Sequence, residues 1–374
     1  MSTVKSMAVV ATEVGKISIQ EVEIGDPKKG EVRVKVIASG ICHTDLGAIN
    51  SAFPPEFGLS YPLVPGHEGV GIVESVGEGV MELAVGDKVI MSYPSCVVCD
   101  MCKKNRPWAC RSRHQLFFGG KFADGTKRIV YKGQETASFF GQGSWSQYCI
   151  VAERNAVKVD PDVDVKMLCS LGCGIQTGFG CVVNRAKPDP GSTIAVFGCG
   201  TVGLAAIMAA KATSCSTIIG VDQNEDRLAL AKELGATHTI NTKEIEDPVK
   251  YIQDLTGGYG VEYTIECTGV PILLEMALNC LDQNGMSVIV GVTGTRSINI
   301  QPEPVIMDPS RTWTGMVEGG SIPKVFIPRL VQLYKDGKIP LEKLVKFYEF
   351  KDVEQAIADT VSGEIIKPVL MMPE

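Results

Sequence analysis

The segment around residue 200 constrains the fold most, because it places three glycines between a predicted strand and a predicted helix. Thr193–Phe197 is a short apolar run, and Val202–Ala212 is long enough and apolar enough to form a buried helix. Gly198, Gly200 and Gly203 lie at the junction in a G-x-G-x-x-G pattern. A strand that passes through such a turn into a helix begins a βαβ unit.

Strand-like and helix-like segments alternate through the rest of this region, which is the order that produces a parallel sheet. One helix has recognisable ends, because Asn224 can cap its start and Gly235 follows its last residue. The sequence therefore predicts an α/β fold with a doubly wound, Rossmann-type sheet. The further predicted strands are Thr217–Val221, Tyr263–Glu266 and Met286–Val290, and the predicted helices are Asn224–Leu234, Asp247–Leu255 and Ile272–Leu281.

The glycine pattern predicts a dinucleotide site. Gly198 permits the tight turn, Gly200 lets the backbone approach a pyrophosphate, and Gly203 lets the helix pack closely on the strand. The helix start then offers free N–H groups to the phosphates. Asp222 ends the next strand, where a carboxylate accepts hydrogen bonds from ribose hydroxyls and repels a 2′-phosphate. This favours NAD over NADP; a glycine-rich turn without a ligand is the alternative.

The N-terminal third is rich in short β-favouring runs and predicts a compact, mostly antiparallel β domain. Its predicted strands are Met7–Val10, Glu31–Ile37, Gly69–Val76 and Lys88–Met91. Between Cys96 and Trp145 we expect loops. Near the C-terminus the helices Pro323–Tyr334 and Val353–Asp359 are expected to pack back onto this first domain.

Four cysteines lie close together in that loop region, spaced C-x2-C-x2-C-x7-C at Cys96, Cys99, Cys102 and Cys110. Four thiolates suit tetrahedral zinc and leave no open position, which indicates a structural site. An iron–sulfur cluster is the main chemical alternative. Free thiols in a loop and a nucleic-acid-binding zinc ribbon are the others.

Composition narrows the class of protein. The formal net charge is −7, which disfavours a nucleic-acid partner. There are 13 cysteines and no export signal at Met1–Gly15, which favours thiols in a reducing compartment over disulfides. Pro190–Ala210 is uncharged and long enough to cross a membrane, but its glycines split it into a strand and a helix. We expect a cytoplasmic protein without a membrane segment.

A second metal site is suggested by three residues in glycine-containing turns, namely Cys42, His67 and Cys173. Two thiolates and one imidazole would leave a fourth zinc position open for water or substrate. Spacing does not select this trio, and each residue taken singly is more often part of a core.

The chain resembles the zinc-containing medium-chain alcohol dehydrogenases along its whole length, and most closely the aryl (benzyl) alcohol dehydrogenases. The motifs that carry the resemblance are C-H-T-D from Cys42, P-G-H-E-G-V-G from Pro65, the four cysteines, G-C-G-I-Q-T-G from Gly172, the glycine pattern, and Val317-Glu318-Gly319-Gly320. The resemblance implies a GroES-like catalytic domain, residues 1–176 and 320–374, around a Rossmann domain, residues 177–319.

The resemblance also implies the roles of individual residues. Two zinc ions are expected per chain, a catalytic one at Cys42, His67 and Cys173 with Glu68 behind it, and a structural one at the four clustered cysteines. Thr44 joins the first three as a catalytic residue. The expected NAD contacts are His43, Thr177, Gly198, Gly200, Thr201, Val202, Gly203, Asp222, Arg227, Val292 and Lys367.

The implied reaction is reversible transfer of hydride from a primary alcohol to NAD, with zinc acting as a Lewis acid on the alcohol oxygen. Thr44 would hydrogen-bond that oxygen and take its proton. Asp45 would orient His67, unless it is an exposed loop carboxylate. Many family members carry a relay histidine where this chain has Gly47, and an arginine facing the pyrophosphate where it has His43, so we expect His43→Arg to raise NAD affinity unless His43 is only a surface residue.

The substrate is predicted less sharply than the reaction. The resemblance places Ser92, Tyr93, Phe139 and Phe140 near the pocket, and aromatic walls favour a benzylic or allylic alcohol, although such residues can equally be core. A glutathione-dependent formaldehyde dehydrogenase and a non-catalytic relative are the alternatives. A homodimer or homotetramer is implied, without nucleic-acid or membrane partners.

Overall fold

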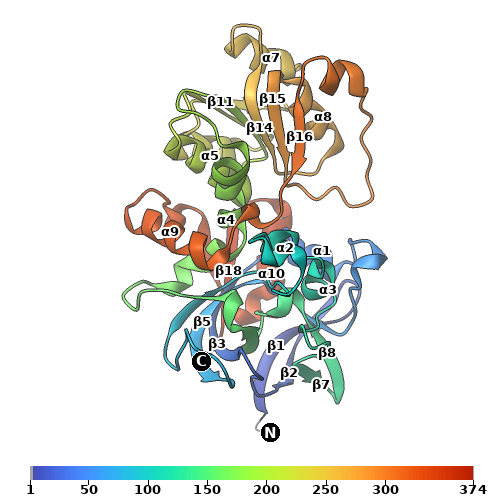
Figure 1. Cartoon of the computed structure of the whole chain (residues 1–374), viewed down its shortest axis with the longest axis vertical. Helices are drawn as coiled ribbons and strands as arrows, with labels where there is room; N and C mark the ends of the chain where they lie inside the picture. The colour runs from blue at the N-terminus through green and yellow to red at the C-terminus, as the bar shows by residue number, and fades with distance from the viewer. Residues whose placement is uncertain (1–2, 374) are drawn as a thin grey trace. The chain divides into compact units, whose positions relative to one another are not determined.

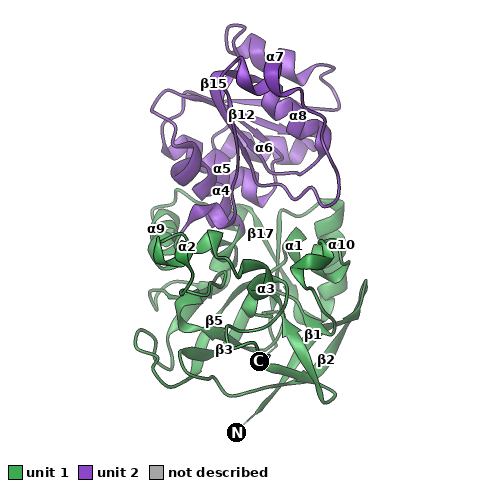
Figure 2. Cartoon of the chain, turned by 45° about the vertical axis from the view of Figure 1, so that its right-hand side comes forward, with its two compact units in different colours: residues 1–173, 322–374 green, residues 174–321 purple. Residues whose placement is uncertain are grey.

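The computed structural model describes residues 3–373, and the chain folds into two compact units. The first contains Met1–Cys173 and Ile322–Glu374, and the second contains Gly174–Ser321 (Figure 2). The chain therefore leaves the first unit after Cys173 and returns to it at Ile322. Figure 1 labels many of the elements named below.

The second unit is built on a six-stranded sheet whose paired strands are all parallel, in the order β13-β12-β11-β14-β15-β16. This is the strand order of a Rossmann sheet, so the predicted α/β class is confirmed. The strands are β11 (Thr193–Phe197), β12 (Thr217–Asp222), β13 (His238–Asn241), β14 (Val261–Glu266), β15 (Leu281–Ile289) and β16 (Thr312–Gly315). The helices are α4 (Gly174–Gly180), α5 (Thr201–Ala212), α6 (Glu225–Leu234), α7 (Pro248–Leu255) and α8 (Pro271–Asn279), with short turns of π or 3₁₀ helix at η6 (Cys181–Ala186), η7 (Glu303–Met307) and η8 (Glu318–Gly320).

Two local predictions in this unit are confirmed. Asn224 caps α6, because its side chain accepts a hydrogen bond from the backbone N–H of Arg227, and Gly235 ends that helix. Gly203 is required by close packing, since a Cβ there would lie 1.8 Å from the carbonyl oxygen of Gly198. The helix thus lies directly on the turn that it follows.

The first unit contains a closed barrel, in the order β1-β2-β7-β8-β4, and a seven-stranded sheet, in the order β10-β6-β5-β3-β18-β17 with β9 paired to β3. The barrel strands are β1 (Val4–Glu13), β2 (Lys16–Ile24), β4 (Leu63–Val64), β7 (Ile129–Tyr131) and β8 (Gln134–Ser138). The sheet strands are β3 (Glu31–Gly40), β5 (Glu68–Val76), β6 (Lys88–Met91), β9 (Tyr148–Ala152), β10 (Ala156–Lys158), β17 (Val345–Glu349) and β18 (Lys367–Met371).

The C-terminal segment belongs to this unit, because β18 pairs antiparallel with β3. The helices of the unit are short except for two near the C-terminus. They are α1 (His43–Ile49), α2 (Asp100–Lys103), α3 (Arg113–Phe117), α9 (Pro323–Lys335) and α10 (Val353–Ser362), with 3₁₀ turns at η1 (Pro55–Phe57), η2 (Pro107–Ala109), η3 (Phe139–Gly141), η4 (Glu153–Asn155), η5 (Val165–Gly172), η9 (Leu341–Lys343) and η10 (Phe350–Asp352).

The prediction of loops between Cys96 and Trp145 is wrong in part. Two short helices form there, and β7 and β8 form a hairpin of the barrel. Lys132 and Gly133 connect the hairpin, both with positive φ, as a two-residue turn between paired strands requires. The three and five residues of these strands are too few to show a clear alternation in the sequence.

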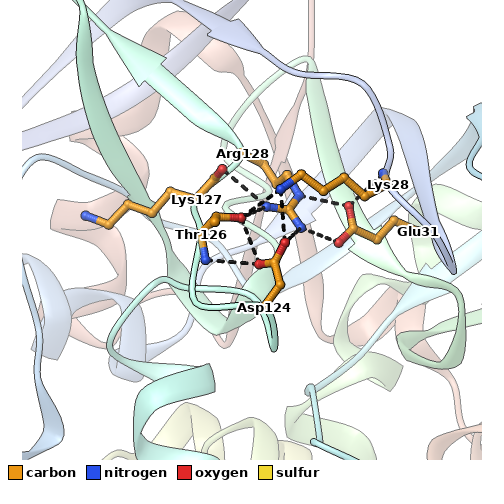
Figure 3. Close-up of polar contacts among 6 residues, drawn as sticks. All are labelled: Lys28, Glu31, Asp124, Thr126, Lys127 and Arg128. Atoms are coloured by element: carbon orange, nitrogen blue, oxygen red, sulfur yellow. Dashed lines mark hydrogen bonds and ion pairs between the residues drawn. The ribbon is translucent and has the colours of Figure 1, made fainter.

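An ion cluster centred on the buried pair of Arg128 and Glu31 ties this hairpin to the start of β3 (Figure 3). The guanidinium of Arg128, only 3% exposed, donates two hydrogen bonds to Glu31 and a third to Asp124. Lys28 reaches the same Asp124 carboxylate from the loop before β3. Burial raises the pKa of Asp124, but hydrogen bonds from the backbone and side chain of Thr126, and then from Lys28 and Arg128, outweigh it and hold that pKa well below its usual value.

Within the described residues, no single helix is both long and apolar enough to cross a membrane. Only the two bent neighbours Val165–Gly172 and Gly174–Ala186 meet those criteria, and only when they are taken together.

Candidate metal centres

The sheet of the first unit brings two of the predicted ligands together. β3 ends at Gly40, two residues before Cys42, and β5 begins at Glu68, directly after His67. Gly40 and Glu68 are paired across the sheet, so the two ligand-bearing turns leave it at the same place. The register of one strand pair therefore sets the distance between Cys42 and His67.

Cys173 joins them from the end of η5. The donor atoms of Cys42, His67, Glu68 and Cys173 all lie within 4.8 Å of one another. The backbone carbonyl of Gly172 is fixed by the hydroxyl of Ser92, which donates to it over 2.8 Å. The structure thus gathers the predicted trio, together with Glu68, into one centre.

The ring of His67 has one nitrogen committed and one available. Its Nδ1 lies 2.8 Å from a carboxylate oxygen of Asp45, whereas Nε2 is buried and has no hydrogen-bond partner. A buried imidazole nitrogen without a partner is costly unless it binds something. The second nitrogen of His67 is therefore the atom that would bind a metal.

Asp45 connects both turns. Its carboxylate accepts hydrogen bonds from the backbone N–H groups of Cys42 and Gly66, each at 3.0 Å, as well as contacting His67. The residue is fully buried, so the alternative of an exposed loop carboxylate is wrong, and its contact with the His67 ring is the one that the predicted orienting role requires. Gly66 has φ of +98°, and a Cβ there would lie 2.5 Å from Trp145, so only glycine fits before His67.

The centre contains one buried ion pair behind the sulfur ligands. Lys367, at the start of β18, places Nζ 2.8 Å from Glu68 and also donates to the carbonyl oxygen of Ile41. Both side chains are almost completely buried. Lys367 was predicted as an NAD contact; in the structure its ammonium group is engaged by Glu68, and the NAD contact stays a prediction.

The electrostatic surroundings favour a thiolate at Cys42. A hydrogen bond with Cys173 lowers the pKa of the Cys42 thiol well below its ordinary value, and the nearby His67 ring lowers it further, against the opposing effect of burial. Thiolate is the form of cysteine that binds metal. Thr44 lies beside it, with its hydroxyl 3.6 Å from the Cys42 sulfur.

Sequence reasoning missed Gln142. Its side chain donates to the carbonyl oxygens of His67 and Ser92 and accepts from the N–H of Gly69, and it is fully buried. It therefore holds the backbone that directly follows His67 and links it to Ser92. No local pattern marks Gln142, because its three partners come from segments far away in the sequence.

Aromatic rings surround one side of the centre. Phe140 lies against the His67 ring, with centroids 4.6 Å apart, and Phe139 meets it edge-on at 5.6 Å. Phe117 and Phe118 extend this group, and Tyr93 packs against Phe117. Of the four predicted pocket residues, Phe139 and Phe140 touch His67, Tyr93 lies further along, and Ser92 uses its hydroxyl on Gly172.

The four clustered cysteines also converge. The sulfur atoms of Cys96, Cys99, Cys102 and Cys110 lie within 4.8 Å of one another, and all thirteen cysteines of the chain are free of disulfides. Backbone N–H groups point at two of these sulfurs, from Arg111 to Cys99 and from Cys96 to Cys110. The Arg111 N–H is the main reason that the pKa of Cys99 falls to about 6, whereas burial raises that of Cys102 to about 12.

The two donor sets fit zinc in different ways. Four sulfurs close a tetrahedral shell, while two sulfurs and one imidazole nitrogen leave a position open. Sulfur and imidazole ligands together suit zinc better than magnesium or calcium, which prefer oxygen. The residues present at both centres therefore fit the metal that the sequence implied.

The predicted dinucleotide residues cluster in the second unit. Gly198 and Gly200 lie between β11 and α5, and Thr201, Val202 and Gly203 form the first turn of that helix. The Asp222 carboxylate accepts hydrogen bonds from the N–H of Cys199 at 2.7 Å and from Gln223 and Asn224 at the end of β12. It is therefore held beside the glycine turn.

The other predicted NAD residues are spread over both units. Thr177 is buried in α4, Arg227 lies in the first turn of α6, and Val292 is 58% exposed after β15. His43 is an exposed residue at the start of α1 in the first unit. Their roles remain predictions.

Comparison with known proteins identifies the family. Residues 28–161 match the model of the alcohol dehydrogenase GroES-like domain, and residues 201–335 match that of the zinc-binding dehydrogenases. A solved structure described as an alcohol dehydrogenase zinc-binding domain protein from Burkholderia ambifaria is 41% identical, with a TM-score of 0.95 and 100% of both chains covered.

Two further solved structures agree. The benzyl alcohol dehydrogenase of Acinetobacter calcoaceticus is 39% identical, with a TM-score of 0.93 over 99% of this chain and 100% of that one. The alcohol dehydrogenase of Thermus sp. ATN1 is 25% identical, with a TM-score of 0.80 over 98% and 100%. With two family models matched and two relatives near 40% identity over the full length, the chain belongs to the zinc-containing medium-chain alcohol dehydrogenases.

Proposed function

We propose that this chain is an NAD-dependent dehydrogenase that oxidises a primary, benzylic or allylic alcohol to the aldehyde. The observation that carries the proposal is the convergence of Cys42, His67 and Cys173, in which the buried His67 Nε2 atom has no protein partner. Three protein ligands and one open position are the arrangement of catalytic zinc, whereas a purely structural site is closed by four.

The metal would supply Lewis-acid stabilisation of the negative charge that develops on the alcohol oxygen. The chain itself contributes Thr44, whose hydroxyl lies 3.6 Å from the Cys42 sulfur and can hydrogen-bond an oxygen beside that ligand and take its proton. Asp45 holds His67 in the tautomer that leaves Nε2 without a proton. Buried aromatic rings around His67 keep water away from the reacting atoms.

The proton route beyond Thr44 cannot use a side chain at position 47. Gly47 has no side chain, and a Cβ built there would lie 3.0 Å from the ring of Phe53, so that ring fills the space a larger residue would need. We infer that Thr44 passes the proton on without help from position 47; the ribose hydroxyls of a bound cofactor, or water, would supply the next acceptor.

The choice of NAD rests on Asp222. Its carboxylate is fixed by three backbone N–H groups at the end of β12, beside the glycine turn. A carboxylate has about four acceptor sites, so further sites remain for ribose hydroxyls. A 2′-phosphate at the same position would meet a negative charge that the fold holds in place.

The choice of an aromatic alcohol rests on two observations. The first is the group of phenylalanines against His67, since flat apolar substrates pack well against rings. The second is the 39% identity to a protein named as a benzyl alcohol dehydrogenase. Neither observation selects one particular alcohol.

The decisive experiment compares kcat/KM for benzyl alcohol and ethanol, with NAD and with NADP. We expect benzyl alcohol and NAD to be preferred and a chelator that removes the metal to abolish the reaction. A preference for ethanol would overturn the aromatic assignment, and a requirement for added glutathione would favour a formaldehyde dehydrogenase instead. Absence of any alcohol oxidation by the zinc-loaded chain would overturn the enzyme assignment.

We also propose two zinc ions per chain, a cytoplasmic location and assembly into a homodimer or homotetramer. Thirteen free thiols support a reducing compartment, and a net charge of −7 gives no support to a nucleic-acid partner. Metal analysis and the mass of the native particle test the first and the last of these. One zinc per chain, or a monomer, would contradict them.

A further inference from the structure

Arg154, in η4, is a half-buried cation that is not paired with a carboxylate within the described residues. Within residues 3–373 no carboxylate forms an ion pair with it. Its Nε donates instead to the carbonyl oxygen of Ser95, at 2.9 Å. Ser95 directly precedes Cys96, so this hydrogen bond holds the chain at the entrance to the four-cysteine cluster.

Arg154 and the cluster also share a cavity of about 190 Å³. Its wall contains Ser95 and Arg154 together with Cys102 and Asn105 of the cluster segment, and Lys324 from the start of α9. The side chain thus lies between the core of the first unit and the segment that carries the four sulfurs. Burial lowers the pKa of the guanidinium, and negative charge on Cys96, Cys102 and Cys110 opposes that effect.

The charge of a metal-loaded cluster makes this position significant. Four thiolates with one Zn²⁺ carry a net charge of −2, from four negative charges and two positive ones. The other nearby cations offset this negative charge less effectively, because each is either paired already or exposed to solvent. Arg111 is committed to Asp100 at 2.9 Å, and the side chains of Lys103, Lys104 and Arg106 are exposed to solvent.

We propose that Arg154 is a positioning residue of the four-cysteine centre, where it supplies a half-buried counter-charge to the zinc–thiolate group and fixes the Ser95–Cys96 backbone. The inference rests on the proposed second zinc. Groups that hydrogen-bond or orient metal ligands from outside typically change metal affinity by about 10–100-fold when removed. Arg154 acts here through Ser95 and through its charge, without touching the metal.

The experiment measures the rate at which the whole zinc-loaded protein releases zinc to a chromogenic chelator, with alkylation of Cys99 and Cys102 followed by peptide mass spectrometry to identify the metal that leaves. We expect Arg154→Met to release the cluster zinc about 10–100-fold faster. Arg154→Lys, which keeps the charge, should lie between Arg154→Met and the wild type. Lys324→Met is the matched control, because Lys324 lines the same cavity but pairs with the exposed Glu82.

Arg154→Gln separates the two parts of the role, since its amide can still donate to Ser95 but carries no charge. A rate as fast as that of Arg154→Met assigns the effect to the charge, and a rate between those of Arg154→Met and the wild type shows that the hydrogen bond to Ser95 carries part of it. If Arg154→Met does not fold, Arg154→Gln and Arg154→Lys decide the question between them.

The experiment distinguishes failure of the proposed second zinc from failure of the proposed role of Arg154. A wild-type protein without zinc at the cluster contradicts the second metal of the proposed function. A wild-type protein that holds this zinc, with Arg154→Gln and Arg154→Lys releasing it at the wild-type rate, overturns the role of Arg154 alone.

Discussion

The two metal centres of the first unit are built by opposite means. In the cluster of Cys96, Cys99, Cys102 and Cys110, all ligands come from one short stretch of chain, and three of the four cysteines are only half-buried. In the centre of Cys42, His67 and Cys173, the ligands come from three distant segments, and buried side chains surround them.

The difference lies in what holds the ligands before a metal arrives. The cluster sulfurs receive mainly backbone N–H groups of their own segment. The open centre is held by side chains from other elements, including Asp45, Gln142 and Lys367. We propose that the cluster depends on its metal for its shape, whereas the open centre is shaped by the sheet and would use its metal for chemistry.

The largest expected effect tests the first half of this comparison. Cys102→Ser should remove one zinc per chain and lower the thermal stability strongly, because structural zinc contributes on the order of 10 kcal/mol in small zinc-binding peptides. Zinc content and the midpoint of thermal unfolding measure this. An unchanged midpoint after loss of that zinc would show that the segment holds its shape without metal.

Cys42→Ser tests the second half. We expect a loss in kcat/KM of about a thousandfold or more, because the substrate oxygen loses several kcal/mol of charge stabilisation. The fold should survive, so circular dichroism should match the wild type and the cluster zinc should remain. Unfolding of this variant would contradict the view that the sheet alone shapes the open centre.

Lys367→Met examines the buried pair behind the open centre. Removing one partner leaves Glu68 as a buried unpaired carboxylate, which typically costs about 3–5 kcal/mol of unfolding free energy. Urea unfolding measures this loss. The double variant Glu68→Gln with Lys367→Met should recover most of it; equal losses in the single and double variants would mean that the pair matters only through packing.

Asp45→Asn is expected to have a smaller effect. The amide keeps the size of the side chain but loses the charge that orients His67, and zinc affinity at the open centre should fall about 10–100-fold. Competition with a chelator measures it. Zinc at the four-cysteine cluster serves as the internal control, and weakening of both sites alike would contradict a local role.

Asp100→Asn should have the smallest effect. The Arg111 guanidinium hydrogen-bonds the Asp100 carboxyl and lowers its pKa to about 2, so the carboxylate stays charged at any pH near neutrality. Exposed ion pairs contribute little, unlike the buried pair at Glu68. Zinc release from the cluster should therefore match the wild type at pH 6 and at pH 8, and a clear acceleration would show that the surface pair shapes the segment.

The contrast also explains what the sequence could and could not predict. The four-cysteine cluster can be predicted from the sequence because its four ligands are close in the chain. The glycine turn at Gly198 can be predicted because a strand and a helix flank it. Cys42, His67 and Cys173 could be grouped only through resemblance to a family, since the sheet register that unites them leaves no spacing in the sequence. Gln142 and the pairing of Lys367 with Glu68 were missed for the same reason.

The β7–β8 hairpin was missed for a different cause. Its strands are too short for periodicity to be visible, and the Lys132-Gly133 turn was the only local indication. The local sequence predicts loop for these residues. Strand pairing within a closed barrel, together with the ion cluster at Arg128, stabilises them as a hairpin instead.

The position of β18 has a consequence for biosynthesis. The cation that neutralises Glu68 is carried by β18, which follows every ligand of the open centre in the chain, so it emerges from the ribosome after all of them have been made. Until then a nascent chain holds the carboxylate beside Cys42 and His67 without its partner. Chains that terminate before β18 would therefore carry every ligand of the open centre but lack the cation that pairs with Glu68.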